Sequence, residues 1–165
     1  MPITDVLHCS EDRFWELYLD PVWIQRMLVE GLHYTGLRLL KNEETPTGLR
    51  RDLVMTPRLN LPAAVAKVIG PSTVITEEGR YERATRTWFW KHQLSTMADK
   101  FVIGGSMRVA ADGPDRVIRR SEVNLECKIF GIGGLVEKAA AGDIRTGFAA
   151  GADFINLEVS RPPAS

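Results

Sequence analysis

The chain has little cysteine, no excess of either charge and no long apolar run. Its two cysteines, Cys9 and Cys127, cannot form a disulfide framework, and we expect both to be free thiols. The 21 basic residues balance the 21 acidic ones, which argues against a general binder of nucleic acid. No stretch approaches the roughly 18 apolar residues of an integral membrane segment, and the first residues show no basic segment followed by an apolar run, so we expect no secretion signal. We expect a soluble, cytoplasmic protein.

Recognisable metal and cofactor motifs are also missing. His8, His33 and His92 have no metal-ligand spacing, and neither CxxC nor HExxH occurs, so we expect no metal and no cofactor. Structural roles at edges or in partly exposed positions are expected for the three histidines. Cys127 is interpreted as a small buried hydrophobe rather than a nucleophile.

Two groups of acidic residues resemble paired catalytic carboxylates. Glu77 and Glu78 are adjacent in a predicted strand, so their side chains must point to opposite faces. Glu122 and Glu126 fall on the polar face of a later strand. We therefore expect both groups to lie on a solvated surface.

The composition is that of a globular protein. Hydrophobic residues make up 44% of the chain and charged residues 25%, and the length fits about one domain. We predict one domain over residues 1–159. The tail, residues 160–165 with Pro162 and Pro163, is expected to be disordered.

The first third of the chain reads as a strand followed by two short helices. The strand covers Ile3 to Cys9, and Ser10 with the acidic residues after it has the features of a helix start. Asp20-Pro21 interrupts this helix, and a second one runs from Val22 to Glu30.

After Gly31, β-branched, aromatic and leucine residues come in runs broken by turn-forming residues, which is typical of strands. A short helix at Leu61–Gly70 interrupts the series. The predicted strands are Leu32–Lys41, Leu49–Thr56, Ser72–Arg80, Arg83–His92, Phe101–Ala111 and Arg116–Phe130. The predicted turns are Asn42–Gly48, the region around Gly79, Ser95–Lys100 and Asp112–Asp115.

Alternation within the later strands predicts which residues point inward. From Phe101 and from Ser121 onward, the odd-numbered residues are mostly apolar and the even ones mostly polar, so the odd side faces the core. In the predicted strand Leu49–Thr56, Arg51, Leu53 and Met55 share one side.

The Trp88-Phe89-Trp90 run carries bulky apolar side chains on both faces, so alternation alone does not orient it. Our interpretation places Trp88 and Trp90 on one face, together with Arg86 and His92.

The longest predicted helix, Gly131–Val159, is amphipathic and poor in bulky side chains. Small residues at 139–142, 147 and 149–152 leave room for a close backbone, a bend at Gly142 or a bound molecule. Its apolar stripe comprises Ile132, Leu135, Val136, Ala139, Ala140, Ile144, Phe148, Ala152 and Ile155.

These elements define an α+β fold. A sheet with one polar face must cover its other face, and the last helix is the one long amphipathic element available to do so. We predict a curved antiparallel sheet of about seven strands wrapped around the long C-terminal helix, with two short helices after the first strand.

The chain resembles the helix-grip domains of the START and pollen-allergen-like superfamily, also called SRPBCC. The resemblance rests on element order and on three segments: Ser10-Glu11-Asp12-Arg13-Phe14, Thr76-Glu77-Glu78 leading to Trp88-Phe89-Trp90, and Lys128–Gly134 followed by Glu137-Lys138. The last of these is most similar to a branch without an assigned function. The resemblance implies a hydrophobic cavity between sheet and helix but names no ligand.

The primary functional hypothesis is a carrier or sensor that binds a hydrophobic small molecule, lipid-like or polyketide-like, in such a cavity. Tight packing of the small residues against the sheet is the alternative. The expected ligand-binding residues are Tyr34, Arg51, Leu53, Met55, Trp88, Trp90, Phe101, Ile103, Met107, Val123, Leu125, Cys127, Leu135, Ala140, Ile144 and Phe148.

Two further functions are kept open. A cyclase-type or hydrolase-type enzyme would need titratable groups inside the cavity, and Arg51, Tyr34, His33 and Glu137 are the candidates, although none forms a catalytic signature. An interaction module or homodimer would use an exposed Trp88–Trp90 run. Of these functions, the sequence favours the non-enzymatic one.

Overall fold

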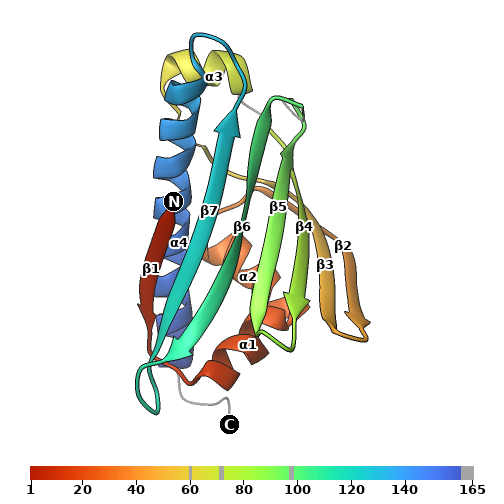
Figure 1. Ribbon diagram of the computed structural model, residues 1–165, viewed down its shortest axis with the longest axis vertical. Helices are drawn as coiled ribbons and strands as arrows, with labels where there is room; N and C mark the ends of the chain where they lie inside the picture. Colours follow the sequence, from red (N-terminus) through yellow and green to blue (C-terminus); the bar gives the residue numbers. More distant parts are fainter. Residues whose placement is uncertain (60, 71–72, 97–98, 161–165) are drawn as a thin grey trace.

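The structure, a computed structural model, describes residues 1–59, 61–70, 73–96 and 99–160 (Figure 1). It consists of an antiparallel sheet with the strand order β1-β7-β6-β5-β4-β3-β2 and a long helix packed along one face. The predicted fold class is therefore confirmed. The elements are β1 (Pro2–Leu7), α1 (Glu11–Leu19), α2 (Pro21–Arg26), the π-helical turn η1 (Met27–Gly31), β2 (Gly36–Thr45), β3 (Gly48–Thr56), α3 (Ala63–Ile69), β4 (Ile75–Glu82), β5 (Thr87–Leu94), β6 (Phe101–Ala111), β7 (Val117–Cys127) and α4 (Gly133–Val159).

The first two helices begin where the sequence indicates. The Ser10 hydroxyl accepts a hydrogen bond from the backbone N–H of Arg13 at 3.2 Å and caps α1. Asp20 accepts bonds from the first N–H groups of α2, which has Pro21 in its first turn. The helix predicted to Glu30 ends as the η1 turn, so the second strand begins at Gly36 rather than at Leu32.

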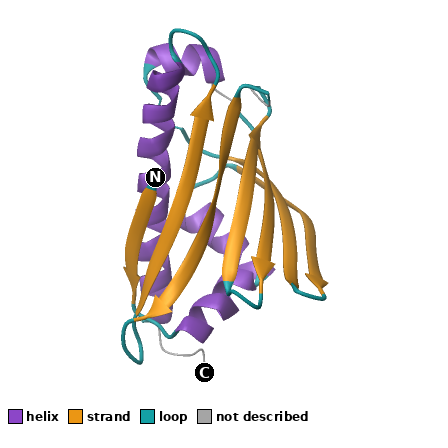
Figure 2. Ribbon diagram, viewed as in Figure 1, coloured by secondary structure: helices purple, strands orange, loops and turns teal. Residues whose placement is uncertain are grey.

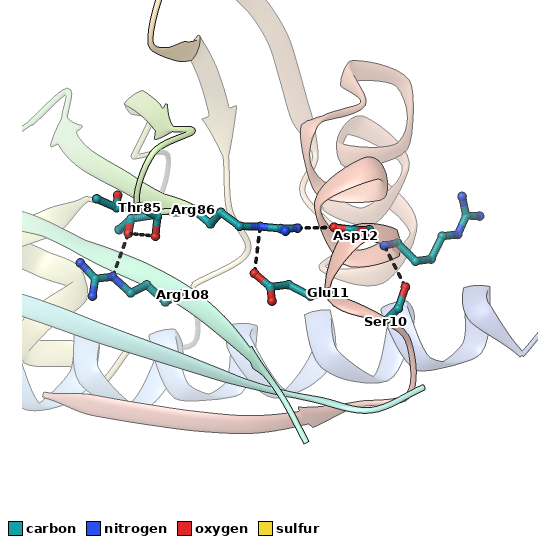
Figure 3. A network of polar contacts seen from close by, with 8 residues as sticks. Ser10, Glu11, Asp12, Thr85, Arg86 and Arg108 are labelled. Carbon is teal, nitrogen blue, oxygen red and sulfur yellow. Dashed lines mark hydrogen bonds and ion pairs between the residues drawn. The ribbon is translucent and has the colours of Figure 1, made fainter. Parts of the chain in front are cut away.

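An arginine of the β4–β5 turn fixes α1 against the sheet. Figure 3 shows the Arg86 guanidinium reaching Glu11 at 2.9 Å and Asp12 at 2.6 Å, both in the first turn of α1. Arg86 adopts a positive φ of 47° in this turn. It lies in the turn just before the start of β5, so the expectation that it shares a strand face with Trp88 and Trp90 is wrong.

Two predicted turns are misplaced. Gly79 lies in the middle of β4, between Arg51 of β3 and Trp90 of β5, and the turn falls after Glu82. The turn predicted over 42–48 shrinks because β2 continues to Thr45. Ser72, the expected start of β4, and part of the 95–100 turn lie outside the described residues, as does the tail from 161 onward.

The core consists of two apolar clusters at opposite ends of the sheet. One gathers α1, α2 and η1 around residues such as Phe14, Trp23 and Trp88, and the other lies under α3 around Val65 and Phe101. Figure 2 shows these helices at the two ends of the sheet, with α4 running the length between them. α4 contacts β1, β7, η1 and α3.

The small residues of α4 serve different purposes along the helix. At its start, a Cβ on Gly133 would lie 2.6 Å from the Cys127 carbonyl oxygen, so helix and strand approach closely there. At Gly142, an added Cβ would meet nothing within 4 Å. The prediction that Leu135 belongs to the buried stripe is wrong, since its side chain is 44% exposed, whereas Val136 is fully buried.

Within the described residues, no helix is long and apolar enough to cross a membrane. Cys9 and Cys127 are free thiols, the first buried and the second half-buried.

Candidate functional site

The inner face of the sheet carries a polar pair between its two apolar clusters. Leu53, Glu77, His92 and Ile103 are opposite one another on β3, β4, β5 and β6. Leu53 belongs to the cluster under α1, and Ile103 belongs to the cluster under α3. The Glu77 and His92 side chains therefore lie between two apolar regions, on the side of the sheet that faces α4.

Glu77 and His92 form a directly bonded carboxylate–imidazole pair. Glu77 Oε2 and His92 Nε2 are 2.8 Å apart, and the two side chains are only 14% and 19% exposed. Burial acts to raise the pKa of Glu77, but the hydrogen bond and charge of His92, with the charge of Arg51, outweigh it and lower that pKa from 4.5. Glu77 is thus an ionised carboxylate near neutral pH.

Arg51 lies beside this pair and is fully buried. Its Nη1 donates a hydrogen bond to the Tyr18 carbonyl oxygen at 2.7 Å, and its guanidinium lies 4.5 Å from the centre of the Trp88 ring system. Among the described residues its Nε has no hydrogen-bond partner. The carbonyl oxygen and the neighbouring aromatic rings stabilise the positive charge of Arg51. This charge favours the ionised form of Glu77.

Two tyrosines complete the polar part of the site. Burial, followed by the negative charges of Glu77 and Asp143, raises the pKa of Tyr34 to about 12. Burial and Glu77 also raise the pKa of Tyr18 to about 12, although Arg51 and Arg119 oppose the shift. Both phenols are neutral donors at physiological pH, and Asp143 brings a carboxylate of α4 within electrostatic reach of Tyr34.

An aromatic contact bridges the sheet and α4. The rings of Trp90 and Phe148 have centroids 6.1 Å apart. Trp90 lies over Gly105 of the neighbouring strand, where an added Cβ would come within 2.7 Å of the indole. Phe148 is held in turn by Arg119, whose Nη2 donates to the Phe148 carbonyl at 2.8 Å and to Asp5 at 2.7 Å.

The predicted site residues separate into three groups by burial. Leu135 is exposed and lies outside the site. The partly exposed ones, which remain accessible beside the Glu77–His92 pair or along α4, are Tyr34, Trp90, Leu125, Cys127, Ala140, Ile144 and Phe148. The ones packed in the two clusters or buried in the sheet are Arg51, Leu53, Met55, Trp88, Phe101, Ile103, Met107 and Val123.

Several sequence expectations need correction. Glu77 is not on a solvated surface, although Glu78, Glu122 and Glu126 are exposed. Trp88 is 0% exposed and Trp90 faces Phe148, so the aromatic run is not an exposed interaction surface. Of the proposed catalytic candidates, His33 is exposed, and Glu137 accepts a hydrogen bond from the Cys127 backbone N–H at 2.7 Å.

The alternation of residues along β4 indicates the Glu77–His92 pair, which the sequence analysis did not predict. Ile75, Glu77, Gly79 and Tyr81 alternate along β4 with the more polar Thr76, Glu78 and Arg80, which places Glu77 on the apolar side. The sequence analysis had also placed His92 on the same strand face as Trp88 and Trp90. The predicted turn around Gly79 was wrong. Because of it, the register that places Glu77 opposite His92 was not predicted.

Two surface hollows lie away from this site. One of about 260 Å³ is lined by charged side chains, including Arg50, Glu78 and Lys91, on the outer face of the sheet. The other, of about 470 Å³, lies beside Ser10 and Glu158 at the end of α4. The described residues contain no group of three or more His, Cys, Asp or Glu side chains placed to hold a metal ion.

Solved structures of several proteins share this fold. A START superfamily protein from Mycobacterium smegmatis is 16% identical, with a TM-score of 0.66 over 97% of this chain and 98% of its own. The Zhui aromatase/cyclase from Streptomyces sp. R1128 is 11% identical, with a TM-score of 0.67 over 98% and 93%. Norcoclaurine synthase from Thalictrum flavum, solved in complex with dopamine and hydroxybenzaldehyde, is 15% identical, with a TM-score of 0.67 over 98% and 88%.

The chain belongs to the family described as "Protein of unknown function (DUF2505)", whose model matches residues 3–157. No curated protein matches the sequence. The resemblance to a START-like branch without an assigned function is confirmed, and the structural likeness, at these identities, establishes the fold alone.

Proposed function

We propose that the protein binds a hydrophobic small molecule between the inner face of the sheet and α4. The observation that carries this proposal is the partial exposure of apolar side chains that point inward, such as Trp90, Leu125, Ile144 and Phe148. In a fully packed core these side chains would be buried. Their remaining accessible surface is what an apolar ligand would cover, with a gain of about 25 cal/mol per Å².

The small residues of α4 are consistent with this role. Ala140 and Ile144 pack against the cluster under α3 without being buried. An added Cβ on Gly147 would meet a single neighbour, Leu32 Cδ2 at 3.9 Å. These two observations support the proposed space for a ligand next to the middle of the helix.

The structural neighbours support a small organic ligand rather than a macromolecule. One is an aromatase/cyclase, and another was solved with dopamine and hydroxybenzaldehyde bound. These compounds are ligands of the neighbouring structures and not of this chain. For this chain they support only the proposal that the ligand is a small organic molecule.

The test compares two substitutions of alanine by phenylalanine on α4. Ala140→Phe would fill the proposed space, whereas Ala149→Phe adds the same bulk at an exposed position. Native mass spectrometry should find a co-purified apolar compound on the wild type and on the Ala149 variant, and no such compound on the Ala140 variant. Titration with 1-anilinonaphthalene-8-sulfonate should follow the same pattern. Equal dye binding by all three folded proteins would contradict the proposal.

Catalysis in the same space is a second candidate function, favoured by the Glu77–His92 pair. A carboxylate that orients an imidazole is a common arrangement for general acid–base chemistry. Its test is to incubate the co-purified compound with wild type and with His92→Phe and to compare product masses. A mass change made only by wild type would establish an enzyme, and an unchanged ligand in both would leave a binding protein.

A further inference from the structure

One end of the molecule carries a fully exposed aromatic side chain. Phe130 lies in the turn between β7 and α4, and it is the only aromatic residue among the exposed large apolar side chains of the described chain. Gly131 follows it with a positive φ of 84°, and a Cβ added there would meet nothing within 4 Å, so the turn stands clear of neighbouring atoms. Because contact of a phenylalanine ring with water is unfavourable, this position favours an apolar partner.

Further apolar surface lies at the same end. Leu135, in the first turn of α4, is 44% exposed, and Val68 of α3 is 37% exposed. Ala63 and Ala64 of α3 are exposed as well. α3 contacts α4, and Figure 1 shows α3 beside the β7–α4 turn at the top of the molecule. These apolar side chains are therefore gathered at one end of the protein.

The charged side chains at this end are mostly positive. α3 and the segment 128–138 carry Lys67, Lys128 and Lys138, all exposed, against Glu137 alone. Glu137 is half-buried and accepts a hydrogen bond from a backbone N–H of β7. Glu126, near the end of β7, offsets part of the positive charge through a 3.7 Å ion pair with Lys128. An excess of positive charge remains around the exposed phenylalanine.

The opposite end of the molecule, where α1 and the β6–β7 turn lie, is acidic (Figure 1). The acidic residues of these two segments outnumber Arg13, Arg116 and the Arg86 that pairs with α1, and they are Glu11, Asp12, Glu16, Asp112 and Asp115. The whole chain has no net charge, so positive and negative charge are separated along its long axis. This separation turns the end with Phe130 toward a negatively charged surface.

We infer that this end docks on the surface of a lipid bilayer that contains anionic headgroups. We call it the α3 end, and its residues are Lys67, Val68, Lys128, Phe130, Leu135 and Lys138. Phe130 and Leu135 would enter the boundary between headgroups and acyl chains, while the lysines contact the headgroups. A fluid bilayer closes around one projecting ring, whereas a protein partner needs a pocket of matching shape.

Docking at the α3 end goes beyond the proposed function and does not depend on it. The apolar cluster under α3 includes the partly exposed Ala140 and Ile144, which line the proposed ligand space. A bilayer at this end would therefore lie next to that space, and an apolar ligand could pass between the two with little exposure to water.

Sedimentation with lipid vesicles tests the inference. The full chain should sediment with vesicles of phosphatidylcholine and phosphatidylglycerol, and much less with phosphatidylcholine alone or at high salt. Phe130→Asp should weaken this binding by about 10-fold or more, as expected when one large apolar side chain no longer leaves water. Val22→Asp is the control and should bind like wild type, because Val22 is 65% exposed but belongs to α2, away from the α3 end.

A second variant measures insertion directly. Phe130→Trp places an indole at the tip of the turn, and lipids with brominated acyl chains should quench its fluorescence. The wild-type protein provides the baseline, since Trp15, Trp23 and Trp88 are buried.

The outcomes separate docking from the proposed function. Wild type that stays in solution with anionic vesicles, or Phe130→Trp fluorescence that bromolipid leaves unchanged, would overturn the inference and leave ligand binding standing. Equal weakening by Phe130→Asp and Val22→Asp would overturn it too. Dimerisation that Phe130→Asp abolishes, without vesicle binding, would overturn it in favour of a contact between two copies of the chain.

Discussion

The indole of Trp88 lies directly on Gly79, one strand away. A Cβ at position 79 would overlap Cζ2 of the indole and come within 3.0 Å of the Arg51 carbonyl oxygen. Trp88 is completely buried and supports the Arg51 guanidinium on its face. The absence of a side chain at Gly79 is therefore what permits the buried tryptophan and arginine to stack.

Gly79→Ala should destabilise the fold by about 3 kcal/mol, because the indole and the strand backbone have no space to move apart. Chemical unfolding monitored by tryptophan fluorescence measures this change. Gly142→Ala is the matched control: it lies in the middle of α4 with open space around the new Cβ, and it should stabilise the protein by about 1 kcal/mol. Equal effects of both substitutions would contradict this account of Gly79.

Asp5→Asn should cost about 3 kcal/mol of stability. Arg119 is 3% exposed and donates two hydrogen bonds to Asp5 Oδ2, so removing the carboxylate leaves a buried cation without its counter-charge. Asp112→Asn provides a comparison, since its ion pair with Arg116 is exposed on both sides and should contribute less than about 1 kcal/mol. Urea unfolding of the two variants at one pH compares them, and equal losses would argue against the role of Arg119.

The stabilising effect of Glu77 should disappear in acid. Its pKa is lowered in the folded protein from 4.5, so the fold favours the carboxylate. This contribution is present above pH 4.5 and is lost as the pH falls through the lowered value. The difference in unfolding free energy between wild type and Glu77→Gln should therefore be larger at about pH 6.5 than at about pH 3. A difference that grows on acidification would refute the pairing with His92.

The tyrosines should make the fold sensitive to alkali. The pKa values of Tyr18 and Tyr34 rise from 10.0 to about 12, because burial and Glu77 disfavour the phenolate. A raised pKa contributes stability that is complete below pH 10 and is lost as the pH rises toward 12. Spectrophotometric titration should show phenolate formation displaced upward relative to unfolded protein, and Tyr34→Phe should reduce the alkaline loss of stability. Ordinary tyrosine titration would contradict the burial of these phenols.

The fold could be predicted from sequence because its signals are local and repeated. Alternation in β6 and β7, the cap at Ser10 and the length of α4 each indicate an element, and an antiparallel sheet leaves few ways to combine them. The site was harder to predict because it depends on register. Glu77 meets His92 only when β4 continues through Gly79, and the exposure of Leu135 depends on the exact turn of α4 that faces the sheet.

The packing of tryptophan side chains against glycines should restrict how these positions vary within the family. Trp88 depends on Gly79, and Trp90 depends on Gly105, through contacts that no larger residue at the glycine position could share. Neither partner can change first without strain or a void. Positions 79 and 88 should therefore vary together among homologues, whereas position 105 should stay glycine, because an added Cβ there would also clash with the Glu122 carbonyl oxygen. A lineage with a smaller residue at 88 is where a side chain at 79 would first be tolerated.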